Sequence, residues 1–336
     1  MISRCVDRRD FIGGLALGAL AAPHVARAQP RRKVHRIGIL SSRSTTSEMV
    51  GPQPQDPLIN ALLRGLRELG YVYGEHFVTE PRGGEGKPER FPDIATELVR
   101  LRVDVIVASG PMLPALKQAT STIPVVTTGA GDPVASGFVK SLGRPGGNIT
   151  GMSLQILETM GKRLELLKAL VPGAAPVGVV LDPRVGRRVW QEVQSAARER
   201  GWKLLALEIR EASDIEKAFN AATGARAGAL LVAPSGLPDA HAGRIAELAI
   251  KNRLPVMYAF RFYVEAGGLI SYGVDISENY RRAAVFVDKI LNGAKPADLP
   301  IEQPTKFELV INLKAARSIG LAIPQPILSR ADEVMQ

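Results

Sequence analysis

Short runs of consecutive hydrophobic residues alternate along the chain with longer segments in which hydrophobic residues recur every three or four positions. Unbroken apolar runs suit strands buried on both faces, whereas the longer spacing places apolar side chains along one side of a helix. In the first half of the chain, strand-like runs lie at 34–40, 76–81, 103–108 and 123–128, and helical segments at 57–69, 91–101 and 111–120. This pattern predicts a parallel sheet covered by helices.

The same alternation restarts in the second half of the chain. Strand-like runs lie at 176–181, 203–209, 227–233, 255–260 and 269–272, and helical segments at 159–170, 188–200 and 238–252. A stretch rich in glycine and proline, Asp132–Gly151, separates the two series. Two such series with a flexible junction predict an α/β fold made of two doubly wound parallel-sheet lobes.

Glycine-rich turns that follow strands often bind phosphate groups, but neither candidate in this chain has the required spacing. After Gly129 and Gly131, the dinucleotide fingerprint needs a glycine at the position of Val134. The stretch Gly83–Lys87 lacks a glycine at position 81 and a serine or threonine at position 88. We therefore predict no nucleotide cofactor. The junction Asp132–Gly151 is then either an active-site loop or a joint between two lobes.

The first 28 residues have the features of an export signal. Arg8 and Arg9 form a twin-arginine pattern, an apolar segment covers 11–22, and Ala26–Ala28 has the small-residue pattern of a cleavage site. This apolar segment is too short to cross a bilayer, which takes about 20 residues, and no later segment reaches that length. We expect a twin-arginine signal peptide over residues 1–28, export to the periplasm, and no direct membrane insertion.

Composition and charge exclude several other classes of protein. The net charge is +10, but basic and acidic residues are interspersed and aromatic residues amount to only 5%, which argues against nucleic-acid binding. Cys5, the only cysteine, precedes the predicted cleavage site, so the exported chain has no disulfide and no thiol chemistry. The four histidines are isolated in sequence, and no serine stands in a G-x-S-x-G motif. We therefore expect no metal site and no hydrolase nucleophile.

Small polar and aromatic residues follow the predicted strands of both series. In open parallel sheets, the carboxyl ends of the strands form the crevice in which ligands bind. These candidate ligand-binding residues are Ser41, Ser42, Ser109, Thr128 and Asp132 in the first series, and Asp182, Ser235, Tyr258, Tyr272 and Asp275 in the second. Each one has a structural alternative as a helix cap or a core residue, but ten such positions on two facing edges favour a cleft.

Several blocks of the sequence, in the same order, resemble one protein family. These blocks are Asp132–Val134, Gly143–Gly151, Glu265–Gly273, Lys295–Pro300 and Pro304–Lys314. They resemble the ABC-transporter substrate-binding family that includes the tryptophan/tyrosine-binding proteins, and the similarity extends from about Lys33 to the C-terminus. The resemblance implies a fold similar to type I periplasmic binding proteins, in which two lobes are joined by a three-crossover hinge.

The resemblance also implies how the chain is divided. The first lobe would contain 34–150 and 276–300, and the second lobe 151–275 and 301–336, so that Pro145–Gly147 forms the turn into a crossover strand. The lobes would close around a small-molecule ligand and deliver it to the membrane subunits of an ABC permease, without any enzymatic reaction. Aromatic amino acids are the ligands that the resemblance implies, and we expect a monomer without a cofactor.

One loop departs from the family. At Asp182–Arg188 the family often has a turn rich in asparagine and proline, so the identity of the ligand does not carry over. For a zwitterionic ligand, Asp132 or Asp275 are candidates to pair with the ammonium group. Hydroxyl groups and backbone N–H groups at Ser41, Ser42, Ser109 and Thr128 are candidates for the carboxylate.

Two other classes of function remain as alternatives. An exported α/β enzyme such as a hydrolase would need a base within reach of a nucleophile, and the sequence shows no such pair. The sensor lobe of a transcriptional regulator shares this general fold, but it would need a DNA-binding helix pair where this chain has its export signal.

Overall fold

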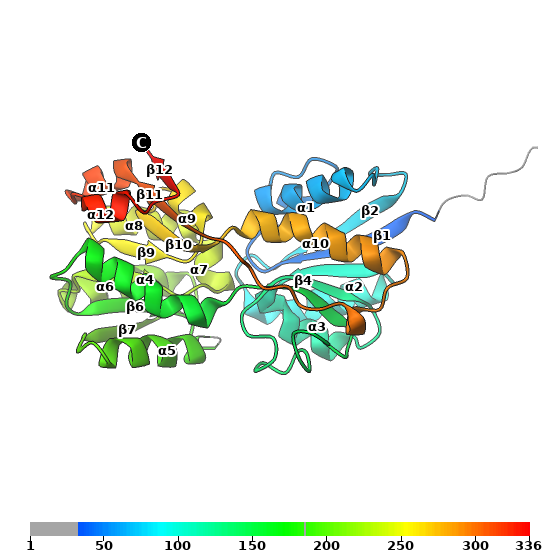
Figure 1. Cartoon of the computed structure of the whole chain (residues 1–336), viewed down its shortest axis with the longest axis horizontal. Coiled ribbons are helices and arrows are strands. Elements are labelled where there is room, and N and C mark those ends of the chain that lie inside the picture. Colours follow the sequence, from blue (N-terminus) through cyan, green and yellow to red (C-terminus); the bar gives the residue numbers. More distant parts are fainter. Residues whose placement is uncertain (1–32, 185) are drawn as a thin grey trace, which may run out of the picture. The chain divides into compact units, whose positions relative to one another are not determined.

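The computed structural model describes residues 33–184 and 186–336. The predicted signal peptide, with its arginine pair and its cleavage site, lies outside the described residues. Figure 1 shows two sheets, each covered by helices, and the chain passes between them three times. The predicted fold of two parallel-sheet α/β lobes joined by three crossovers is confirmed.

The first sheet has the strand order β2-β1-β3-β4-β5, and all its neighbouring strands are parallel. Its strands are β1 (His35–Ser41), β2 (Phe77–Gly83), β3 (Val105–Ser109), β4 (Val125–Ala130) and β5 (Ile149–Ser153). Its helices from this part of the chain are α1 (Pro57–Glu68), α2 (Phe91–Arg100) and α3 (Leu113–Ala119). The alternation predicted from the hydrophobic runs is therefore present, with β4 ending two residues later than expected.

Both faces of this sheet are buried, as its unbroken apolar strands require. In β3, Val105 and Val107 pack in one core with α1, whereas Ile106 and Ala108 pack in the opposite core with α2 and α3. The core on the α1 side also includes α10 (Ile276–Leu291), which lies beside α1 although it comes from much later in the chain (Figure 1).

A single glycine permits the close approach of these two helices. A side chain at Gly65 of α1 would place its Cβ 2.4 Å from the carbonyl oxygen of Arg281 in α10, well inside van der Waals contact. The two helix backbones therefore touch at this point, and α10 is held against the first sheet.

The second sheet has the strand order β12-β11-β10-β9-β8-β6-β7. Its strands are β6 (Val177–Leu181), β7 (Leu204–Glu208), β8 (Ala229–Val232), β9 (Val256–Tyr258), β10 (Ile270–Val274), β11 (Phe307–Asn312) and β12 (Glu333–Met335). The helices around it are α4 (Ile156–Leu170), α5 (Arg187–Arg198), α6 (Ser213–Gly224), α7 (Gly236–Ala240), α8 (Ala242–Lys251), α9 (Arg261–Glu265), α11 (Leu313–Ile319) and α12 (Gln325–Leu328).

Two features of the second sheet were not predicted from the sequence. Strand β11 runs antiparallel to β10, because the chain leaves β10 for α10 in the first lobe and re-enters the second sheet from that side. The single helix expected over 238–252 is instead two helices, α7 and α8, which meet at His241. The short helix α7 follows directly after β8 and carries Asp239.

Candidate functional site

A cleft is lined by residues of both lobes and consists of two adjoining pockets. The large pocket has a volume of about 290 Å³ and the small pocket about 60 Å³. The two pockets share the lining residues Gly110, Pro111, Gly129, Leu154, Asp239 and Phe260, so they lie side by side.

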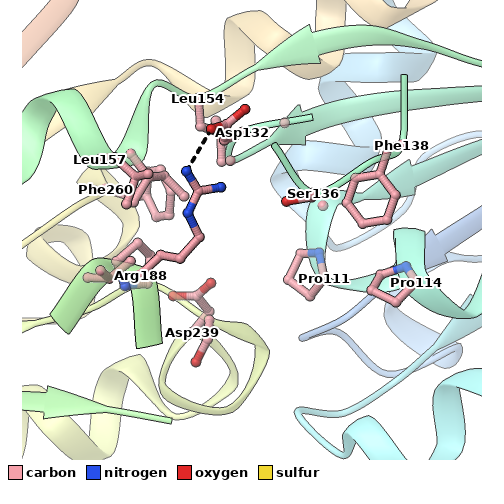
Figure 2. A pocket seen from close by; sticks show the side chains of 17 residues that line it. Pro111, Pro114, Asp132, Ser136, Phe138, Leu154, Leu157, Arg188, Asp239 and Phe260 are labelled. Atoms are coloured by element: carbon pink, nitrogen blue, oxygen red, sulfur yellow. Dashed lines mark hydrogen bonds and ion pairs between the residues drawn. The ribbon is translucent and has the colours of Figure 1, made fainter. Parts of the chain in front are cut away.

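The large pocket has mostly apolar walls (Figure 2). Pro111, Pro114 and Phe138 line it from the first lobe, and Leu157 and Phe260 from the second. Its polar side chains are Asp132, Ser136, Arg188, Ser235 and Asp239. A cavity of this size with a few polar groups suits a small ligand that has an apolar body.

Two of these polar residues form an ion pair between the lobes. Arg188 of α5 donates from Nη2 to Oδ2 of Asp132, which follows β4, over 3.1 Å (Figure 2). The other carboxylate oxygen of Asp132 accepts the backbone N–H of Ala135 at 2.9 Å. Asp132 therefore acts as a local cap, as its structural alternative predicted, and its charge is balanced by an arginine of the other lobe.

The small pocket brings together four of the predicted residues, Ser41, Ser42, Ser109 and Thr128. Several of their polar groups already have partners within the first lobe. Ser41 Oγ donates to Ser44 Oγ at 2.9 Å, and the backbone N–H of Ser42 donates to Ser109 Oγ at 3.0 Å. Ser44 in turn donates a short hydrogen bond to Asp56. These hydroxyl groups therefore stabilise the wall of the pocket as well as lining its interior.

Arg43 also lines the small pocket and contacts the second lobe. Its guanidinium carbon lies 4.7 Å from the ring centroid of Phe262, a cation–π contact, and its Nη2 lies 3.4 Å from Oδ2 of Asp56. Its Nε is buried and has no hydrogen-bond partner among the described residues. Phe262 stacks on Tyr263, and Tyr263 stacks on Tyr258, with centroid distances of 4.8 and 4.6 Å.

Asp239 lines both pockets and was not among the residues predicted from the sequence. Its Oδ1 accepts a hydrogen bond from the hydroxyl group of Tyr263 at 2.8 Å. Burial raises the pKa of Asp239 to about 7, although the Tyr263 hydrogen bond and the charge of Arg43 act in the opposite direction. Within the described residues Asp239 has no ion pair, which distinguishes it from Asp132.

The sequence carried a weak signal for Asp239. Position 239 comes four residues after Ser235, where a predicted strand ends, and so belongs to the right edge of the sheet. Ser235 itself lines the large pocket, and its hydroxyl group has no hydrogen-bond partner among the described residues.

Four predicted residues line neither pocket. Asp182 is buried and receives two hydrogen bonds from the side chain of Arg184, at 2.9 and 2.7 Å. Tyr258 is fully buried in the core, and Tyr272 stacks on Phe307. Asp275 caps α10 by accepting the backbone N–H of Glu278 at 3.1 Å. A ligand contact at any of these four positions stays a prediction.

Residues 33–184 and 186–336 contain no group of three or more histidine, cysteine, aspartate and glutamate side chains placed to hold a metal ion. None of their helices combines the length and the apolar character that crossing a bilayer requires.

The sequence matches one family over most of its length. Residues 49–335 match the family described as ABC transporter substrate binding protein. A tyrosine-binding protein of Clostridioides difficile is 25% identical over 293 residues, which cover 86% of this chain and 82% of that relative.

Solved structures with the same fold include three from bacteria. A conserved domain protein of Vibrio cholerae has a TM-score of 0.79 at 28% identity, covering 90% of this chain and 100% of that chain. A domain from Streptococcus pneumoniae in complex with L-Trp has a TM-score of 0.79 at 24% identity and the same coverage. A ligand-free, open substrate-binding protein of Clostridium difficile has a TM-score of 0.62 at 25% identity, again with that coverage.

The family match therefore agrees with the observed fold, in which two α/β lobes line one cleft. That family consists of substrate-binding components of transporters and not of enzymes, which excludes the hydrolase alternative. This chain belongs to the ABC transporter substrate-binding protein family.

Proposed function

We propose that this protein is the periplasmic solute-binding component of an ABC uptake transporter. A small molecule enters the cleft, the lobes close around it, and the closed protein delivers it to the permease subunits in the membrane. Closure exchanges solvation and open-state freedom for contacts that both lobes make with the ligand at once. The observation that carries this proposal is the pair of adjoining pockets whose walls come from both lobes.

The proposed lobes are 34–150 with 276–300, and 151–275 with 301–336, and the hinge is formed by the three connections between them. Some contacts across the cleft are side-chain contacts that can form and break as the lobes close and open. They include the ion pair of Asp132 with Arg188 and the cation–π contact of Arg43 with Phe262.

Amino acids with an aromatic or other apolar side chain are the first ligands to test. The relatives include a protein named for tyrosine and a structure with L-Trp. The apolar walls of the large pocket, from Pro111 to Phe260, are compatible with such a side chain. Export by the twin-arginine route, cleavage before Gln29 and a monomeric state are further parts of the proposal.

A thermal-shift screen of the chain 29–336 against amino acids, aromatic acids and small peptides tests this function. A ligand should raise the melting temperature, because it binds the folded state only. Small-angle scattering should then show a smaller radius of gyration with that ligand. A ligand that binds without any change in the radius would contradict hinge closure, and the absence of any ligand would contradict solute capture.

A further inference from the structure

We propose that the cleft selects a ligand by its positive charge, that Asp239 is the counter-ion, and that the ligand needs no carboxylate group. The inference rests on the proposed function and narrows its ligand class to molecules with an apolar body and an ammonium group. Amines that lack a carboxylate would then bind as well as the corresponding amino acids.

Asp239 differs from the other acids at the cleft because it is not paired with an arginine. Asp132 is occupied by Arg188 and by the backbone N–H of Ala135. Asp56, behind the small pocket, caps α1 by accepting two backbone N–H groups at 2.8 and 3.1 Å, and it also contacts Arg43 and Ser44. Asp239 accepts hydrogen bonds from the Tyr263 hydroxyl group and from the backbone N–H of Ser235, and among the described residues it has no ion pair.

Asp239 belongs to the wall that the large and small pockets share, so a ligand in either pocket lies near its carboxylate. Figure 2 shows its side chain across the open part of the large pocket from Pro111 and Pro114. An ammonium group at Oδ2 would leave the apolar remainder of the ligand against these prolines and Phe260.

The two arginines of the cleft are both paired, Arg188 with Asp132 and Arg43 with Asp56. Nε of Arg43 and Oγ of Ser235 are buried and have no hydrogen-bond partner among the described residues, but neither adds an unpaired positive charge. When Asp239 is ionised, the cleft holds one unbalanced negative charge, which an amine neutralises and which a ligand carboxylate would aggravate. Unbalanced charge in a partly buried site is costly.

This arrangement also predicts a pH dependence of binding. Burial raises the pKa of Asp239 to about 7, so its carboxyl group is partly protonated near neutral pH. A bound cation requires the ionised form of this group. The charged and titratable groups that face it are Arg43, Tyr263 and Tyr280, with the pair Asp132–Arg188 in the same pocket. Burial lowers the pKa of the neighbouring His241. The affinity for an amine should rise about tenfold between pH 6 and pH 8.

The test uses sets of three ligands that share one apolar body. One set is L-tryptophan, tryptamine and indole-3-propionate, and the others are built in the same way on L-phenylalanine and L-leucine. Titration calorimetry of the chain 29–336 at pH 8 should show that the amine of at least one set binds at least as tightly as the amino acid. The acid of that set should not bind at millimolar concentration.

Two variants assign the effect to one carboxylate. Asp239→Asn keeps the size of the side chain and an acceptor for Tyr263, and it should weaken amine binding by tens- to thousands-fold. Asp93→Asn removes an exposed acid that lies in neither pocket, and it should leave the affinity unchanged. The melting temperature of each variant checks its folding, and the ligand sets and the pH series on the unmodified chain remain decisive if a variant does not fold.

The inference would be overturned if every amine bound more weakly than its amino acid or not at all, if the acid of a set bound most tightly, or if Asp239→Asn left the amine affinity unchanged. An affinity that does not change with pH would remove Asp239 as the counter-ion. None of these results contradicts the proposed function, because a ligand of another class that closes the lobes in the scattering experiment would still support solute capture.

Discussion

Asp132 and Arg188 lie on different lobes and form an ion pair across the large pocket, with 3.1 Å between Oδ2 and Nη2. The two side chains are 33% and 50% exposed, so the pair is accessible to water and ions. Pairs with this exposure contribute about 0.2–1 kcal/mol, which is small for stability but sufficient to shift an equilibrium between open and closed lobes.

Arg188→Gln should therefore shift the ligand-free protein toward the open state. We expect a larger radius of gyration in small-angle scattering at low ionic strength, because the variant loses the contact between the lobes. The unmodified protein should approach the same radius when salt screens the pair. Arg187→Gln removes the same charge from the preceding, exposed position of α5 and should have no effect. Equal radii for Arg188→Gln and the unmodified protein at low salt would show that the pair does not hold the lobes.

Gly65→Ala should destabilise the first lobe. The added Cβ would lie 2.4 Å from the carbonyl oxygen of Arg281, and the two helix backbones would have to separate. Overpacking of this kind costs about 1–3 kcal/mol, which urea unfolding followed by circular dichroism would measure.

Gly161→Ala is the matched control for this change. Gly161 lies inside α4, and the nearest atom to an added Cβ is Ala196 Cβ at 3.8 Å, an ordinary contact distance. This variant should gain up to about 1 kcal/mol, since alanine favours a helix interior over glycine. Equal effects of the two substitutions would mean that the contact between α1 and α10 does not contribute to stability.

Most of the fold could be predicted because its signals are local. The apolar runs at 103–108 and 123–128 became β3 and β4, and their residues point alternately into two cores. The direction of β11 could not be predicted in this way, because it depends on the path of the chain through the first lobe and not on residues 307–312 themselves.

The candidate site was harder to predict because its chemistry depends on pairs that are distant in sequence. Asp132 was correctly placed at a strand end, but its partner Arg188 comes 56 residues later and from the other lobe. Asp239 was missed because 238–252 was expected to be one helix, whereas the break at His241 places Asp239 on a separate short helix at the cleft. Hydrophobic periodicity carries no information on which acid is left without a cation.

The contribution of Asp239 to the stability of the ligand-free protein should fall as the pH rises from about 4 to about 7. Burial raises the pKa of Asp239 to about 7, whereas the unfolded chain keeps a value near 3.8, so in this window the folded state binds more protons. Asp239→Asn removes this effect and should be more stable than the unmodified protein at pH 8 by roughly 1–3 kcal/mol, given about 1.4 kcal/mol per pKa unit and partial contact with water.

Urea unfolding over a pH series measures this difference directly. Asp93→Asn, which removes an exposed acid, should follow the unmodified protein at every pH. If Asp239→Asn and the unmodified protein keep a constant difference from pH 4 to pH 8, the carboxyl group of Asp239 does not titrate with a raised pKa.

Tyr263→Phe should weaken amine binding at neutral pH and less so at higher pH. The hydroxyl group of Tyr263 donates to Oδ1 of Asp239 at 2.8 Å and thereby favours the ionised carboxylate, which lowers its pKa relative to burial alone. Without this hydrogen bond the pKa of Asp239 rises further, and a cation must compete with a more tightly held proton. Hydrogen bonds to charged groups contribute about 1.5–3 kcal/mol, so the dissociation constant at pH 7 should rise about tenfold or more.

Tyr258→Phe is the control, because both variants lose one hydroxyl group from the same aromatic stack. Tyr258 lies 4.6 Å from Tyr263 between ring centroids, but its hydroxyl group is buried and has no hydrogen-bond partner among the described residues. Its removal should leave the pH profile of amine binding in place and should not reduce the melting temperature, since an unsatisfied buried polar group is lost. Calorimetric titrations of both variants with tryptamine from pH 6 to pH 9 separate the two roles. A profile that moves to higher pH only in Tyr263→Phe supports Tyr263 as the residue that positions and tunes Asp239, whereas equal profiles would reduce Tyr263 to a packing residue.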